Sequence, residues 1–247
     1  PLSLWFRAIW WVTAQKNGAS ALGLQRILGL RSYQTAWAWL HKLRRAMVRP
    51  GRDRLAGRVE IDETYLGGLE EGRPGRGSGR KALVVIAAQE DGSRIGRIRM
   101  RRVPDASAKS LEGFVADAVE PGSVVHTDGW SGYAALEEKG YRHEATAQGR
   151  LDIPGAEEDL LPRVHRVVSL LKRWLLGTHQ GAVSPAHLDY YLDEFTFRFN
   201  RRTSASRGKL FYRLIQQAAA VHPAPYRSLT KGVRGPGRRR HKRLGLP

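Results

Sequence analysis

The segment V-E-I-D-E-T-Y-L-G-G, residues 59–68, constrains the fold more than any other part of the sequence. Apolar and acidic residues alternate at its start, and two glycines end it. An alternation with a period of two predicts a strand on which Val59 and Ile61 face a core while Glu60 and Asp62 face the other way. A carboxylate on a rigid strand is well placed to bind a hard cation. The segment therefore predicts a metal-binding strand, with Asp62 as a ligand.

A second aspartate stands in a similar position in H-T-D-G-W-S-G-Y, residues 126–133. A short apolar run at Val124 and Val125 predicts a strand, and Asp128 ends it just before Gly129 turns the chain. Two aspartates at strand ends indicate two-metal phosphoryl transfer. Taken singly, each has a simpler interpretation, because Asp62 could be a strand-end turn residue and Asp128 part of an Asp-Gly turn.

Composition limits the class of protein. The chain has 247 residues, 41% of them hydrophobic, which is enough for one α/β core and a small accessory domain. A net charge of +19 indicates a polyanionic partner, and nucleic acid is the obvious one. Zero cysteines exclude disulfides and fit a cytoplasmic protein. No run of about 18 apolar residues indicates a membrane span.

Residues 1–50 predict a helical DNA-binding segment. Ser20 is placed to cap a helix over 21–28, Gly29 ends it, and Ser32 is placed to cap a second helix over 33–47. Apolar residues of the second helix share one face. The polar residues assigned to the opposite face are Gln34, Thr35, His41, Arg44 and Arg45. This pattern is compatible with a helix-turn-helix in which Gln34, Thr35, Arg44 and Arg45 contact DNA. An ordinary helical hairpin with a solvated basic face is the alternative, and the pattern alone leaves both open. Residues 49–57 form a linker.

Residues 58–222 predict a catalytic domain. After the first strand, residues 70–79 form a Gly- and Arg-rich loop. Strands are expected over 82–88 and 95–103, joined by a turn at Asp91-Gly92, and Ser107 caps a helix. The Val124 strand, a helix over 131–139 and a strand over 141–146 follow. This order resembles the RNase H-like fold, a mixed five-stranded α/β sheet with flanking helices. In that fold the first and fourth strands are neighbours, which would bring Asp62 and Asp128 together.

Four motifs together resemble a family. They are the two segments above, S-L-L-K-R-W-L-L-G-T-H-Q-G at 169–181 and Y-L-D-E-F-T-F-R-F-N-R-R at 191–202. In this order they resemble bacterial insertion-sequence transposases of the DDE class. Similar proteins usually carry a cysteine zinc ribbon before the helix-turn-helix; this sequence has none, and we expect a missing N-terminal module.

The resemblance implies two divalent ions, Mg²⁺ or Mn²⁺, bridged by Asp62 and Asp128. Glu63 should point to the other face of the strand and serve as a supporting hydrogen-bond acceptor. The family places Glu or Asn seven residues before the lysine of S-L-L-K-R, and here that position is His165. An imidazole can bind a divalent ion but removes a negative charge and favours Mn²⁺, so His165 is expected as the third ligand. A phosphate-contacting or structural role is the alternative. Three other acidic residues compete for the place of the third ligand: Glu157, Glu158 and Glu194. None of them stands at the helical spacing from Lys172 that the family requires.

The same helix is predicted to contact DNA. Seven residues make two helical turns, so Lys172 shares a face with His165 and could reach the phosphate beside the scissile bond. The alternative is a solvated helix lysine beside Arg173, which is also assigned to DNA. His126, His143 and His179 could touch DNA or metal, or be structural.

The C-terminal part begins with a helix over 185–200, whose apolar stripe predicts core packing. Arg201 and Arg202 at its exit are assigned to DNA contacts or to bracing the active site. A last helix is expected over 207–220. Residues 223–247 predict a basic flexible tail that binds phosphates through Arg238, Arg239 and Arg240.

The sequence thus predicts an enzyme that binds double-stranded DNA at element ends, cuts it and joins the 3′-hydroxyl to target DNA, as a homodimer or larger assembly. Two alternatives remain open: a catalytically inactive, transposase-derived DNA-binding protein, and a nuclease or resolvase with the same fold.

Overall fold

The computed structural model describes residues 1–49, 51–67, 81–146, 160–181 and 183–230. The predicted 70–79 loop, Glu157, Glu158 and the tail arginines Arg238, Arg239 and Arg240 lie outside these residues.

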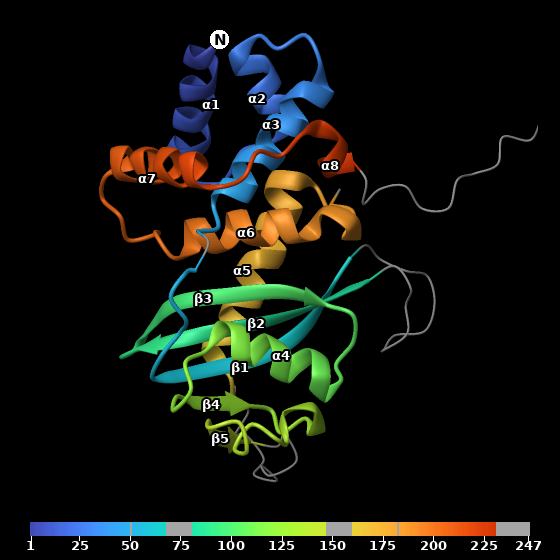
Figure 1. Cartoon of the computed structure of the whole chain (residues 1–247), viewed down its shortest axis with the longest axis vertical. Helices are drawn as coiled ribbons and strands as arrows, with labels where there is room; N and C mark the ends of the chain where they lie inside the picture. Colours follow the sequence, from blue (N-terminus) through green and yellow to red (C-terminus); the bar gives the residue numbers. More distant parts are fainter. Residues whose placement is uncertain (50, 68–80, 147–159, 182, 231–247) are drawn as a thin grey trace, which may run out of the picture.

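A mixed five-stranded sheet forms the centre of the protein, as predicted (Figure 1). Its strands, in the spatial order β3-β2-β1-β4-β5, are β1 (Arg58–Leu66), β2 (Ala82–Asp91), β3 (Arg94–Val103), β4 (Val124–Thr127) and β5 (Arg142–Ala145). The first three strands are antiparallel, and β4 and β5 run parallel to β1. The fold is α/β and consistent with the RNase H-like class.

One turn and one strand pairing describe the register of this sheet. Gly92 adopts a positive φ of 58° in the turn that joins β2 to β3, as its place in Asp91-Gly92 predicts. Between β1 and β4, Glu60 pairs with His126. Asp62 and Asp128 each lie two residues beyond that pair, so the expected neighbourhood of the two aspartates is confirmed.

Helices cover both faces of the sheet. On one face, Val59 and Ile61 share a core with residues of α4 (Ala108–Ala118). On the other, alternate residues of β2, Val84 and Ile86, pack with α5 (Pro162–His179) and α6 (Leu188–Phe199). The predicted apolar stripe of α6 belongs to this core. Ser107 caps α4 by accepting a bond from the Ser110 N–H.

The helix predicted over 131–139 is wrong. A 3₁₀ turn, η1 (Ser131–Tyr133), is followed by further turns up to residue 140. The backbone bonds here span three residues, as between the N–H of Leu136 and the carbonyl of Tyr133. A tight fit explains the difference from the amphipathic pattern, since Gly132 lies so close to Leu111 that an added Cβ would come within 2.7 Å of it.

Three helices precede the sheet: α1 (Leu2–Ala14), α2 (Ala21–Leu28) and α3 (Tyr33–Ala46). Ser20 caps α2 with a 3.0 Å bond from the Gly23 N–H, and Gly29 ends it at a φ of 64°, both as predicted. Ser32 precedes α3 but makes no cap bond, and its hydroxyl donates to the side chain of Gln34.

The N-terminal helices share a core with the C-terminal ones. Phe197 of α6 and Leu214 of α7 (Arg207–Ala220) pack among residues of α1, α2 and α3. Figure 1 shows α6 and α7 between these helices and the sheet. The helical region is therefore fixed to the rest of the protein through α6 and α7 as well as through the linker.

A buried ion-pair network crosses this boundary and overturns one expected DNA contact. Arg44 does not face solvent: its side chain is 2% exposed, and its Nε donates to Glu194 at 2.8 Å. Arg198 Nε donates to the other oxygen of Glu194 at 2.8 Å. Burial alone would raise the pKa of Glu194, but the charges of Arg198 and Arg44 outweigh it and lower the pKa to about 2. Position on α3 could not distinguish this arginine from a surface one.

His41, assigned to the same polar face, is also buried. Its ring lies 4.1 Å from the ring of Trp37 and 4.9 Å from that of Tyr190. Neither ring nitrogen has a hydrogen-bond partner among the described residues. Burial, followed by the charge of Arg44, lowers its pKa from 6.5 to about 2.

The predicted tail contains a short helix, α8 (Tyr226–Thr230). Leu229 is buried, and its carbonyl lies 3.1 Å from Nε2 of His187. The tail prediction is therefore wrong at its start, because one apolar residue and one backbone acceptor tie the segment to η3 (Pro185–His187). No helix among the described residues is long and apolar enough to cross a membrane.

We predict that His41→Phe makes the protein less sensitive to acid. The folded state keeps His41 neutral while the unfolded state protonates it below pH 6.5, so this histidine lowers the free energy of unfolding as the pH falls. Between pH 6.5 and 4 the loss is at most about 3 kcal/mol. The free energy of unfolding is measured by urea unfolding, followed by Trp fluorescence. The measurements are made at about pH 7, 5.5 and 4, which bracket the ordinary histidine pKa. An equal loss in the wild-type protein and the variant would contradict the assignment.

Candidate active site

Three of the predicted site residues come from elements that meet at the centre of the sheet. Asp62 lies on β1, Asp128 follows the end of the adjacent β4, and His165 lies in the first turn of α5. Nε2 of His165 is 3.3 Å from Oδ2 of Asp62. The side chain of Asp62 is 18% exposed and that of His165 is 42% exposed, so the pair is accessible from solvent.

The alternation of β1 also fixes the helix that carries His165. Glu60 lies on the same side as Asp62 and is buried. Its Oε2 accepts the backbone N–H groups of Arg163 at 2.7 Å and Val164 at 2.9 Å. At the start of α5, Leu161 makes no side-chain cap bond. Glu60 therefore serves as a cap from another element and holds the first turn of α5 over β1.

Arg163 strengthens this junction. Its Nη1 contacts Glu60 at 2.9 Å and Glu90 of β2 at 2.7 Å, and its Nη2 donates to the carbonyl of Gly92 at 3.0 Å. Sequence reasoning missed both Glu60 and Arg163 as positioning residues. The alternation placed Glu60 beside Asp62, but nothing in the sequence tied it to a helix about a hundred residues later.

Electrostatics mark Asp62 as perturbed. Burial raises its pKa, a bond from the Glu63 backbone and the nearby His165 oppose this, and Asp128 adds a further rise. Within the described residues, no Lys or Arg forms an ion pair with Asp62 or Asp128. Two neighbouring carboxylates without a basic partner are typical of sites that use divalent ions.

The next residue, Glu63, points to the other face as predicted. Its Oε2 accepts a bond from the hydroxyl of Tyr133 at 3.0 Å. Burial and the charge of Glu63 raise the pKa of Tyr133 well above its ordinary value. Since Tyr133 belongs to the turn that follows Asp128, this bond links the two strands that carry the aspartates.

Asp128 also shapes its own turn. Its Oδ1 accepts the N–H of Trp130 at 3.0 Å, and Gly129 adopts a φ of 82°. Asp128 is therefore a turn residue as well as a neighbour of Asp62. The turn uses only its Oδ1, and Oδ2 is not needed for the bond to Trp130.

The donor chemistry of these residues fits a divalent ion, since carboxylates and an imidazole suit Mg²⁺ or Mn²⁺. Their spacing is looser than a formed site: among the described residues, no group of three or more His, Cys, Asp or Glu side chains could hold a metal ion as they stand. Asp62 and His165 are in contact, and Asp128 follows the adjacent strand β4.

Comparison with known families decides the class. Residues 54–200 match the family described as the ISXO2-like transposase domain. The chain belongs to this transposase family. The match spans β1 to α6 and so includes Asp62, Asp128, His165 and the Glu60 junction. No curated protein matches the chain.

In this transposase domain, the two residues of α5 that are predicted to contact DNA face solvent. Lys172 and Arg173 are exposed on α5, two turns beyond His165. Trp174 of the same helix lies partly buried against the core, and its indole N–H donates to the carbonyl of Asn17 at 2.9 Å. Contact of Lys172 and Arg173 with DNA stays a prediction.

The three other histidines have structural neighbours. Nε2 of His126 lies 2.8 Å from the hydroxyl of Thr146, and Nε2 of His143 lies 2.9 Å from that of Thr127. Both contacts join β4 to the segment of β5. His179 packs edge-on against Trp174, with 4.6 Å between ring centroids. Their geometry favours the structural alternative.

The remaining residues assigned to DNA fall into two groups. Gln34 and Thr35 are exposed at the start of α3, and Arg45 is half-buried. Arg201 and Arg202 bind backbone carbonyls: Arg201 that of Phe197 at 3.2 Å, and Arg202 those of Ile95 and Gly96. Arg201 therefore binds the backbone of α6, and Arg202 binds the backbone of β3.

We predict that Glu60→Gln destabilises the protein by about 1–3 kcal/mol, because an amide is a weaker acceptor for the α5 N–H groups and leaves Arg163 without one carboxylate. Glu90→Gln is the matched control, since it also loses a contact to Arg163 but none to the helix backbone, and should cost less than about 1 kcal/mol. Thermal or urea unfolding measures both. Equal effects would show that Glu60 acts only through Arg163.

Proposed function

We propose that this protein binds double-stranded DNA at the ends of a mobile element, cleaves it with two divalent ions and joins the exposed 3′-hydroxyl to target DNA. One observation supports the proposal: within the transposase-domain match, Asp62 lies on the strand next to β4, which Asp128 follows, and 3.3 Å from His165. DNA is the substrate that membership in a transposase family implies.

The residues have separate roles in this proposal. Asp62, Asp128 and His165 would hold two divalent ions, Mg²⁺ or Mn²⁺. Ions bound there would activate water or a 3′-hydroxyl and stabilise the leaving oxygen during in-line attack on phosphate. Lys172, exposed on the same helix as His165, contacts the phosphate beside the scissile bond.

The N-terminal helices would recognise the element ends. α2 and α3 pack against each other around the Gly29 turn, and exposed Gln34 and Thr35 stand at the start of α3, where a helix-turn-helix contacts base edges. Arg44 is not part of this surface. Joining two ends in one reaction requires a homodimer or larger assembly on DNA.

A second candidate is a DNA-binding protein without catalytic activity. Two observations favour it: an imidazole occupies the position where the family resemblance implies Glu or Asn, and no three-donor group is formed among the described residues. Metal-dependent cleavage separates the two candidates.

We predict that Asp62→Asn, Asp128→Asn and His165→Ala each reduce cleavage and strand transfer by roughly 100-fold or more while leaving DNA binding intact. The assay uses labelled element-end DNA with Mg²⁺ or Mn²⁺. Asp117→Asn is the control, because Asp117 is a 69% exposed carboxylate that pairs with Arg101 on the surface. A wild-type protein that binds DNA but never cuts it with either metal would favour the inactive candidate.

We also predict that His165→Glu shifts the preferred metal. The wild-type protein should be more active with Mn²⁺ than with Mg²⁺, because an imidazole suits softer ions, and a carboxylate at this position should restore Mg²⁺ activity. The ratio of cleavage rates in the two metals measures the shift. If His165→Glu leaves this ratio unchanged, His165 is not a ligand.

A further inference from the structure

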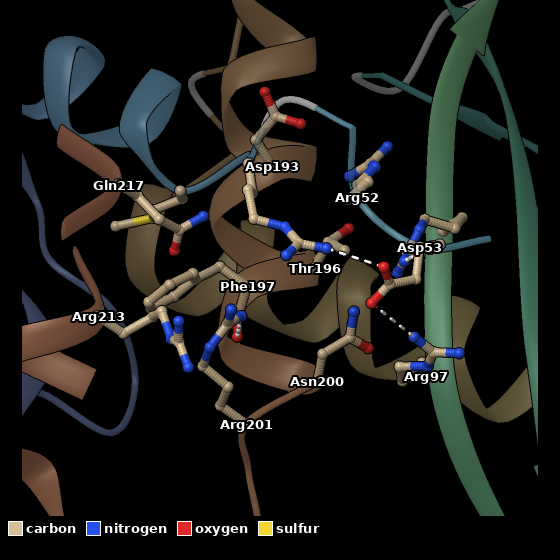
Figure 2. Close-up of a pocket in the computed structure, with 13 residues that line it drawn as sticks. Arg52, Asp53, Arg97, Asp193, Thr196, Phe197, Asn200, Arg201, Arg213 and Gln217 are labelled. Carbon is tan, nitrogen blue, oxygen red and sulfur yellow. Dashed lines mark hydrogen bonds and ion pairs between the residues drawn. The ribbon is translucent and has the colours of Figure 1, made fainter. Parts of the chain in front are cut away.

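An arginine-lined pocket of about 340 Å³ lies outside the site described above. It is formed by residues of the linker after α3, β3, α6 and α7 (Figure 2). The six arginines that line it are Arg49, Arg52, Arg97, Arg99, Arg201 and Arg213. Asp53 and Asp193 are its two carboxylates.

The pocket is separate from the aspartates. β3 is one edge strand of the sheet, and β2 lies between it and β1, which carries Asp62. Asp128 follows β4, on the far side of β1. No ligand of the proposed metal site lines the pocket.

The carboxylates neutralise only part of this charge. Asp53 is shared, with Arg49 at 2.9 Å and Arg97 at 3.9 Å. Burial raises the pKa of Asp193 to about 7, so this group is only partly ionised at neutral pH. The pocket therefore keeps a surplus of positive charge.

Several guanidinium groups have donors to spare. Arg201 donates to the backbone of Phe197. Arg52 and Arg213 make no hydrogen bond or ion pair with any described residue. Figure 2 shows Arg201 and Arg213 on one side of the pocket and Arg52 and Arg97 on the other. Donors on both walls face one space.

The arginines also act on one another. Burial and then the charges of Arg52 and Arg97 lower the pKa of Arg99 to about 10. Burial and the charges of Arg213 and Arg49 lower the pKa of Arg201. Like charges held together without enough counter-charge are relieved when an anion binds between them.

We propose that this pocket binds a phosphate group of the DNA backbone. Planar guanidinium forks match the oxygens of phosphate and bind them through paired hydrogen bonds. The side chains of Arg49 and Arg97 are 51% and 41% exposed, so the pocket is open to a ligand that extends into solvent, as a DNA strand does. A net charge of +19 favours a polyanion over a single small anion. The proposal rests on the proposed function only in taking DNA as the ligand.

The experiment measures DNA binding at a series of KCl concentrations, by fluorescence anisotropy with a labelled duplex of arbitrary sequence. Arg52→Gln and Arg213→Gln should each weaken binding and reduce the slope of log K against log salt by about one, because each removes a phosphate contact. Arg52→Lys and Arg213→Lys keep the positive charge but lose the planar guanidinium fork. Their affinity for DNA should therefore lie between that of the wild-type protein and that of the Gln variants.

Arg142→Gln is the matched control. Arg142 is exposed on β5, at the opposite edge of the sheet, so the variant loses the same charge outside the pocket. Its salt slope should equal that of the wild-type protein. Arg213 is exposed on α7, so its replacement leaves the fold intact, which a thermal melt of each variant verifies.

A second arm separates DNA from free phosphate. Melting temperatures are compared with inorganic phosphate and with chloride at equal ionic strength, for the wild-type protein and the double variant Arg52→Gln/Arg213→Gln. If phosphate stabilises only the wild-type protein and the salt slopes do not change, the pocket binds free phosphate and the DNA proposal is overturned. Unchanged salt slopes in both Gln variants without any phosphate effect also overturn it.

Failure of this proposal and failure of the proposed function give different results. If the wild-type protein does not cleave DNA but the salt slopes change as expected, the proposed catalytic function is contradicted and the phosphate pocket is supported. If the wild-type protein cleaves DNA but the Gln variants have unchanged salt slopes, the proposed function is supported and the phosphate pocket is contradicted.

Discussion

The bond between Glu60 and the start of α5 connects the two elements on which the candidate active site depends. Asp62 lies on β1 and His165 on α5, and neither strand nor helix alone fixes their separation. A buried carboxylate is costly unless it is fully hydrogen-bonded, and Glu60 meets that condition with two backbone N–H groups and Arg163. Since Glu60 is two residues from Asp62 on the same side of β1, the cap places His165 directly over the aspartate.

A second buried charge joins the helical region to the sheet. Glu194 of α6 binds Arg44 of α3 and Arg198 of its own helix, and α6 also packs on β3. Removing one member would leave a buried charge without a partner, which costs several times more than loss of a surface pair. DNA held by the N-terminal helices would therefore have a defined position relative to the sheet, because α3 and β3 contact the same helix.

The sequence predicted features that depend on neighbouring residues. Alternation on β1, the Asp91-Gly92 turn and the Ser20 and Ser107 caps are local, and the structure confirms them. The misses depend on partners far along the chain. Arg44 looked like a surface residue because Glu194 is 150 residues away. The 131–139 segment has a helical pattern, but packing of Gly132 against Leu111 decides its shape. The arginine pocket is drawn from four segments, so no single motif signals it.

The distribution of partners separates carboxylates that stabilise the fold from those available for chemistry. In a chain with 42 Lys and Arg against 23 Asp and Glu, an acidic side chain easily finds a basic partner. Glu60 and Glu194 do so, and both are buried. Asp62 contacts only an imidazole among the ion pairs of the described residues, and Asp128 forms none. Arginines beside these two would hold them as internal salt bridges and compete with any cation. Among the described residues no arginine pairs with these two aspartates: Arg163, on the same side of the sheet, pairs with Glu60 and Glu90, and six arginines line the pocket at β3. The proposed metal site and the proposed phosphate pocket each require this separation.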